Sequence, residues 1–206
     1  MAPGKPVVLK SGCSETDFEF ADDGALIAVC RNELGDADGF GSKICRAEKD
    51  NLGDWRCERD FKKYDSPLVF KHGSKIYLVG RRNLNKSGNF DLKKGEITDR
   101  KKAITFAADY WKQPKRCSLW EVHPEKLKVR FIADLPSKGD TCFPSVIQEF
   151  GGHDRNSPCN SGSCPRNSYM LYNYTSPVDG PDVSWNQGQL GHTLIYRILL
   201  TFPEQQ

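Results

Sequence analysis

The chain has 206 residues, of which 37% are hydrophobic and 28% charged, and 30 basic against 27 acidic side chains leave a net charge of +3. This length fits one ordinary domain and can bury a sizeable core without help from disulfides. The basic residues are interspersed with acidic ones, which argues against a dedicated nucleic-acid-binding protein. No apolar stretch approaches the ~20 residues that span a bilayer, so membrane insertion is not expected.

Eight cysteines are many for a cytosolic protein. Their spacing lacks the paired ligands of a zinc site, so we expect no metal. Cys159 and Cys164 flank a short loop and are expected to pair, and Cys45 and Cys57 form a second candidate pair across a turn. The cysteines and two glycosylation sequons suggest an extracellular or secretory setting, although no apolar signal segment opens the chain. Together these observations suggest part of a longer protein.

In chain order, the pattern is mostly that of short β-strands separated by turns. We expect strands at residues 16–20, 25–31, 66–71, 75–80, 104–107, 117–122, 128–133, 142–148, 169–174 and 193–200. Asp23-Gly24 and Gly73-Ser74 supply the turn chemistry of two hairpins. Helical periodicity is weak and confined to residues 97–110. Two polar segments, near 83–102 and 151–167, are expected to be loops inserted into the sheet framework, where functional loops are common.

Several strand–turn–strand units along the chain are alike, each with an apolar strand that ends in a polar residue. Such repetition is typical of propeller blades. At roughly 40–50 residues a blade, residues 1–206 provide three to four blades, whereas ring closure needs about four to eight. We therefore expect a single all-β domain that is part of a propeller.

The segment from Ser14 to Asn32 resembles the sialidase superfamily, whose six-bladed propellers contain an N/S-E followed by L-x-D-G-x-L and an arginine. In that family the glutamate activates a tyrosine nucleophile, and the arginine is one of three that clamp the substrate carboxylate. The resemblance places Glu15 and Arg31 in those roles, and either Arg81 or Arg82 as the third clamp arginine. Residues 50–55 resemble a degenerate Asp-box. The resemblance thus implies an exo-glycosidase that releases a terminal, anionic sugar from glycans without a cofactor.

The chemistry explains these residue types. Arginine offers a planar fork that matches a carboxylate, which lysine does not. A tyrosine has a pKa near ~10, so a neighbouring carboxylate such as Glu15 must accept its proton. The family position of the nucleophile falls on Phe143, which has no hydroxyl. Tyr172 is therefore our candidate nucleophile, and Tyr174 on the same expected strand is the alternative.

Each candidate also has a structural explanation. Glu15 could be a polar residue in a surface turn, and Arg31 and Arg81 could form salt bridges between blades. Arg82 faces away from Arg81 if the strand persists, so one of the two is structural. Asp65 could line the mouth of a propeller as a substrate-binding residue or serve a turn.

Other features also leave alternatives open. The four tryptophans could stack on sugars or lie in the core. The acidic residues at 33, 36 and 38 could bind calcium or belong to a solvated loop. A non-catalytic propeller remnant that binds glycans or proteins is the alternative to a glycosidase. A disulfide-rich extracellular interaction module would be favoured if Arg31 and Arg81 lay far apart. The sequence does not define the sugar, its linkage or the oligomeric state.

Overall fold

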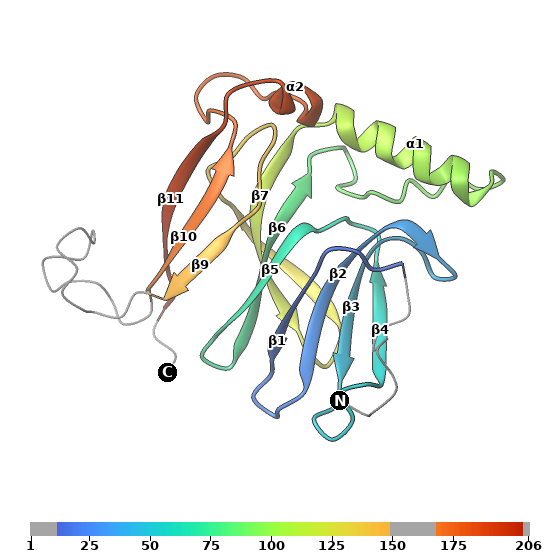
Figure 1. The fold of residues 1–206 in the computed structure, drawn as a ribbon, viewed down its shortest axis with the longest axis vertical. Coiled ribbons are helices and arrows are strands. Elements are labelled where there is room, and N and C mark those ends of the chain that lie inside the picture. Colours follow the sequence, from blue (N-terminus) through green and yellow to red (C-terminus); the bar gives the residue numbers. More distant parts are fainter. Residues whose placement is uncertain (1–11, 149–167, 204–206) are drawn as a thin grey trace, which may run out of the picture.

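Residues 12–148 and 168–203 are described here from a computed structural model. Three antiparallel sheets stand side by side like the blades of a propeller, and both helices lie at one end of them (Figure 1). The first sheet holds β1 (Thr16–Phe20), β2 (Leu26–Asp36), β3 (Gly39–Ala47) and β4 (Trp55–Asp60). The second holds β5 (Asp65–His72), β6 (Lys75–Asn83), β7 (Lys115–His123) and β8 (Lys128–Asp134). The third holds β9 (Ser145–Gln148), β10 (Ser168–Thr175) and β11 (Leu194–Thr201). The expected all-β partial propeller is confirmed, with three blades among the described residues.

Alternating side chains on β6 fill the spaces on its two sides, because successive residues of a strand point to opposite faces. Ile76 and Leu78 pack against the first sheet, in a cluster that includes Ile27 and Val29 of β2. Tyr77 and Val79 pack against the third sheet, in a second cluster. These two clusters form apolar layers between the three sheets, and a third cluster packs the helix α1 (Asp99–Lys112) against the first sheet through Phe40, Phe90, Phe106 and Tyr110. Continuing the same alternation places Arg31 and Arg81 on core-facing sides of β2 and β6.

The prediction of a strand at residues 104–107 is wrong, because this segment lies in the helix α1 (Asp99–Lys112). Thr98 caps the helix by accepting a hydrogen bond from the Lys101 backbone N–H, and Phe106 and Tyr110, four residues apart, form its buried stripe. The expected loop at 83–102 therefore ends where α1 begins. A short apolar run does not distinguish a strand from a turn of helix, which explains the error. The other expected loop, 151–167, lies outside the described residues.

Strands β3 and β4 were not among the expected strands, because glycines and charged residues dominate residues 33–60. Asp36 and Asp38, considered as calcium ligands or loop residues, each form an ion pair with Lys43 at 2.6 Å. The segment 50–55, which resembles an Asp-box, forms the turn that leads from β3 into β4.

Three disulfides join described cysteines. The expected Cys45–Cys57 pair is confirmed across the β3–β4 hairpin. Two pairs were not expected: Cys13–Cys30 and Cys117–Cys142. The pair expected between residues 159 and 164 lies outside the described residues. Three disulfides favour an oxidising, extracellular or secretory compartment. Neither described helix is long and apolar enough to cross a membrane.

Candidate functional site

A cluster of charged side chains comes from the start of β5, the middle of β2 and the last residues of β6 and β10. Its centre is Asp65, the first residue of β5, which is 2% exposed. The two oxygens of Asp65 lie 3.3 Å from Arg31 Nη1, 3.3 Å from Lys63 Nζ and 3.3 Å from Arg81 Nη1. Tyr110 of α1 donates a hydrogen bond of 2.6 Å to the same carboxylate. One buried carboxylate therefore joins the two arginines predicted from sequence.

The environment of Asp65 keeps it ionised. Burial alone raises the pKa of Asp65, but the charges of Lys63 and Arg81, the hydrogen bond from Tyr110 and the charge of Arg31 outweigh it, so the pKa lies below its ordinary value. Conversely, burial and the adjacent Asp65 charge hold the pKa of Tyr110 well above its ordinary value. Tyr110 is thus a fixed hydrogen-bond donor, and not a group that ionises.

Glu15 lies at the exposed side of the cluster. One carboxylate oxygen is 3.0 Å from Arg31 Nη1, and the other accepts a hydrogen bond of 2.7 Å from the Ser66 backbone N–H. The side chain of Glu15 is 38% exposed, compared with 19% for Arg31. Arg31 also donates through Nε to Ser14 Oγ at 3.0 Å and pairs through Nη2 with Glu33 at 3.1 Å. Every nitrogen of this guanidinium already has a partner in the protein.

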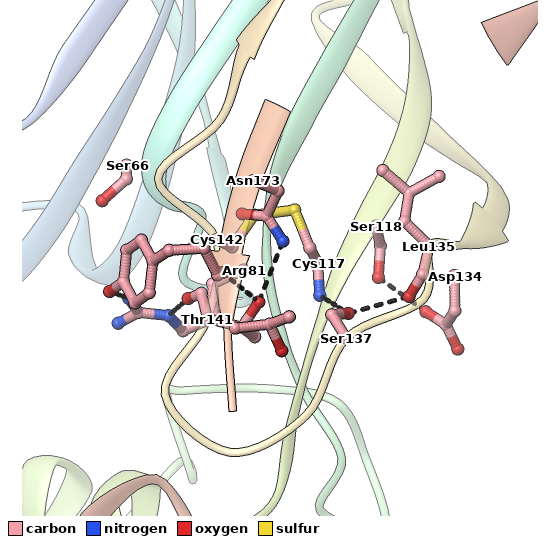
Figure 2. Close-up of a disulfide and its surroundings, with 12 residues drawn as sticks. Ser66, Arg81, Cys117, Ser118, Asp134, Leu135, Ser137, Thr141, Cys142 and Asn173 are labelled. Atoms are coloured by element: carbon pink, nitrogen blue, oxygen red, sulfur yellow. Dashed lines mark hydrogen bonds between the residues drawn. A yellow bond between two sulfur atoms is a disulfide. The ribbon is translucent and has the colours of Figure 1, made fainter. Parts of the chain in front are cut away.

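Arg81 links the cluster to the third sheet. Its Nε donates 2.6 Å to the Thr141 carbonyl, a contact visible beside the Cys117–Cys142 disulfide in Figure 2. Its Nη2 lies 3.3 Å from the Tyr174 hydroxyl and 3.8 Å from Asp140. The Tyr174 hydroxyl is in turn 3.0 Å from Asp140 Oδ1. Burial, together with Asp140, raises the pKa of Tyr174 to about 12 against the opposing charge of Arg81.

The backbone beside the cluster is strained at two positions. Ser66 has φ 46° and Cys142 has φ 78°, values that residues other than glycine rarely adopt. Ser66 supplies the N–H that holds Glu15, and Cys142 follows Thr141, whose carbonyl holds Arg81. The Cys117–Cys142 disulfide fastens this second position to β7. Strained backbone of this kind concentrates at functional sites, where the surrounding structure must enforce it.

Three of the residues singled out from the sequence lie apart from the cluster. Arg82 faces the other side of β6 and forms a two-pronged pair with Asp134, at 2.8 and 2.5 Å. Tyr172 of β10 is 38% exposed, and its hydroxyl has no hydrogen bond to the part of the chain that is described. Phe143 is 66% exposed beside the disulfide segment. Tyr174, the other candidate tyrosine, is the one that contacts Arg81.

The sequence reasoning did not identify Asp140, Tyr110, Lys63 or Lys115. Lys115 is fully buried and donates to the Gln113 carbonyl at 2.7 Å and to Asn83 Oδ1 at 3.1 Å. Burial and the charge of Arg81 lower the pKa of Lys115 to about 7. The sequence holds one signal for Asp140, which lies three residues before Phe143, the position that the sialidase resemblance gives to the nucleophile.

A cavity of about 490 Å³ lies outside the cluster, between the β2–β3 turn, the end of β4 and the segment that leads into α1. Six of its eight charged side chains already form ion pairs. Arg59 pairs with Asp91, Lys102 pairs with Asp99, and Asp36 and Asp38 pair with Lys43. We therefore place the candidate site at the cluster and not in this cavity. The described residues contain no group of three or more histidine, cysteine or acidic side chains arranged to hold a metal.

Comparison with solved structures supports the fold. The chain is similar to the GH93 alpha-L-arabinofuranosidase of Fusarium graminearum in complex with arabinobiose, with a TM-score of 0.50 and 7% identity over 92% of this chain and 45% of that one. It is similar also to the alpha-L-arabinanase of Penicillium chrysogenum complexed with arabinobiose, with a TM-score of 0.50 and 9% identity over 92% of this chain and 46% of that one. The chain thus spans less than half of either protein. No protein-family model and no curated protein matches it. At such low identity the likeness concerns the fold alone.

Proposed function

We propose that the cluster is a carbohydrate site of the exo-glycosidase type. The observation that carries this proposal is the convergence of Glu15, Arg31, Arg81 and Tyr174 around one buried carboxylate at one end of the blades. Strained backbone at Ser66 and Cys142 supports it. The two proteins of similar fold are both glycosidases with arabinobiose in their structures, which makes a sugar the first ligand to test.

In this proposal Tyr174 is the nucleophile, because it and not Tyr172 contacts Arg81. With a pKa of about 12 the hydroxyl needs a base, and Asp140 is positioned to take its proton. The Tyr174 oxygen forms a bond to the anomeric carbon, the proton passes to Asp140, and the leaving group departs with the electron pair. Arg81 stabilises the charge that develops on the phenolic oxygen.

The second step uses Glu15. A water molecule attacks the anomeric carbon, Glu15 accepts the proton of that water, and the bond to Tyr174 breaks. Tyr174 then recovers its proton from Asp140, Glu15 releases the proton of the water to solvent, and the sugar leaves with the hydroxyl of the water. Arg31 and the Ser66 N–H hold the two carboxylate oxygens of Glu15 in place at the exposed side of the cluster.

The charge balance of the cluster bears on the sugar. Four carboxylates, of Glu15, Glu33, Asp65 and Asp140, stand against three cations, of Arg31, Lys63 and Arg81. Because the arginines are already paired, a carboxylated sugar must displace Glu15 or Glu33, whereas a neutral sugar can donate hydroxyls to them. We therefore rank neutral sugars first and the anionic sugars of a sialidase second.

A non-catalytic glycan-binding role is the second candidate. The occupied guanidinium groups and the exposed Phe143, in the position that the sialidase resemblance gives to the nucleophile, both favour it.

The test is turnover of a panel of fluorogenic aryl glycosides that includes arabinofuranosides and sialosides. These leaving groups depart without protonation, so the assay needs only the groups named above. Tyr174→Phe and Glu15→Gln should each abolish turnover, while Tyr172→Phe should leave it unchanged. Absence of turnover together with binding of the sugars would favour the non-catalytic role.

A further inference from the structure

Two tryptophan rings stack on each other beside the cluster. Trp111, in the last turn of α1, is 45% exposed, and Trp185 is the first residue of the short helix α2 (Trp185–Gln189). The rings stack with 6.3 Å between centroids and 24° between planes. The Trp185 ring lies 5.9 Å from the Arg81 guanidinium carbon. An aromatic surface therefore runs from solvent to the arginine that holds Tyr174.

The position of this surface is fixed from α1. Tyr110 reaches into the cluster and donates to Asp65, so its neighbour Trp111 is held at a set distance from the same carboxylate. The Trp185 backbone N–H donates 3.1 Å to the Gln113 carbonyl just beyond α1. These contacts hold Trp111 and Trp185 to one segment of the chain.

Helix α2 is also packed tightly against the cluster. A Cβ added to Gly188 would lie 2.1 Å from the Asp140 backbone nitrogen, so only glycine permits this approach. The N-terminus of α2 is held by a capping box between Ser184 and Gln187. Within the described part of the chain, the buried indole N–H of Trp185 has no hydrogen-bond acceptor, which leaves one donor unpaired beside Arg81.

We propose that Trp111 and Trp185 form a stacking surface for the second sugar ring of a glycan whose terminal ring lies at the cluster. This inference rests on the proposed function, because it takes the cluster as the place of the terminal sugar. The apolar C–H face of a sugar ring packs on an indole, and an indole presents a large rigid surface at little cost in conformational entropy. The two indoles themselves carry no charge that would select an anion.

The experiment is calorimetric titration with arabinobiose, lactose and sialyllactose, each compared with its terminal monosaccharide. Trp111→Ala should weaken disaccharide binding about tenfold, as expected when an aromatic anchor is truncated, and leave monosaccharide binding unchanged. Trp111→Phe should lose less. Phe131→Ala is the matched control, because Phe131 is 47% exposed on β8, beside Arg82 and away from the cluster. It should bind both classes of sugar like the parent.

The outcomes separate this inference from the proposed function. Binding that depends on Trp111 without any turnover would support the surface and overturn the glycosidase. Turnover together with unaltered disaccharide binding in Trp111→Ala would overturn the surface alone. Equal loss for monosaccharides and disaccharides would overturn it as well, as would a dimer that Trp111→Ala converts to monomers, since the rings would then be a contact between copies. Failure of every sugar to bind would overturn both.

Discussion

Asp65→Asn provides the sharpest test of the cluster. The substitution preserves shape but removes the charge that three cations share at 3.3 Å each. Each pair is worth about 5 kcal/mol of Coulomb energy at an effective dielectric near 20. Desolvation offsets most of this attraction, and breaking a buried pair costs about 3–5 kcal/mol in practice. For a domain of this size the loss corresponds to a fall in Tm of about 6–20 °C.

The assay is urea unfolding followed by tryptophan fluorescence at several pH values. Since the pKa of Asp65 is lower in the folded than in the unfolded chain, its contribution is complete above the unfolded value of about 4. It is lost as the pH falls from there through the folded value. The difference in unfolding free energy between parent and Asp65→Asn should therefore shrink below about pH 4.

Asp134→Asn is the control for this experiment. Asp134 also pairs with an arginine, Arg82, but its side chain is 32% exposed and its partner 29%. The expected cost is below about 1 kcal/mol. Two results would refute the reasoning: a cost for Asp65→Asn no greater than that for Asp134→Asn at pH 7, or a cost that does not decline in acid.

Three further predictions concern groups around the cluster. Because the pKa of buried Lys115 falls to about 7, the unfolded chain binds a proton above pH 7 that the folded chain has released. The unfolding free energy of the parent should therefore rise by about 1–3 kcal/mol relative to that of Lys115→Met between pH 7 and pH 9.5. Urea titrations in which the unfolding free energies of both proteins change equally with pH would contradict this. Replacing Cys117 and Cys142 together by Ser should lower the unfolding free energy by about 3.5 kcal/mol, because the disulfide closes a loop of 25 residues. It should also lower turnover by releasing the Thr141 carbonyl. Unchanged unfolding curves would exclude a stabilising role of the disulfide. Gly188→Ala should displace α2 from Asp140 and lower both the Tm and sugar affinity, whereas Gly53→Ala, with nothing within 4 Å, should change neither.

The strands and two arginines of the cluster could be predicted because their signals are local. Period-two alternation and the turns at Asp23-Gly24 and Gly73-Ser74 define β1, β2, β5 and β6. An arginine that continues such an alternation lies on the same side of the strand as its apolar neighbours. The same rule assigns Arg81 and Arg82 to opposite sides of β6, since they are consecutive residues of one strand. The disulfides were predictable only where two cysteines flank a turn, as Cys45 and Cys57 do, because connectivity in general does not follow from sequence.

The remaining parts of the cluster depend on long-range packing. Tyr172 and Tyr174 share one face of β10, and only the position of the strand end brings Tyr174 to Arg81. Tyr110 contributes because residues 99–112 form a helix over the sheets, where the sequence suggested a short strand. Asp140 depends on the path of the chain into β9, which has no periodic signal.

The exposure of the cluster separates its structural role from its chemical one. Asp65 at 2%, Arg31 at 19% and Glu15 at 38% form one chain of ion pairs from the core to the surface. A group at the buried end cannot contact a ligand without the loss of pairs that hold three strands together, whereas Glu15 can exchange its partners for a ligand at little cost. Substitution of Asp65 should therefore mainly lower the unfolding free energy, whereas substitution of Glu15 should mainly lower turnover. A cluster that serves stability alone would show only a graded loss of folding free energy, with sugar binding unchanged at its exposed end.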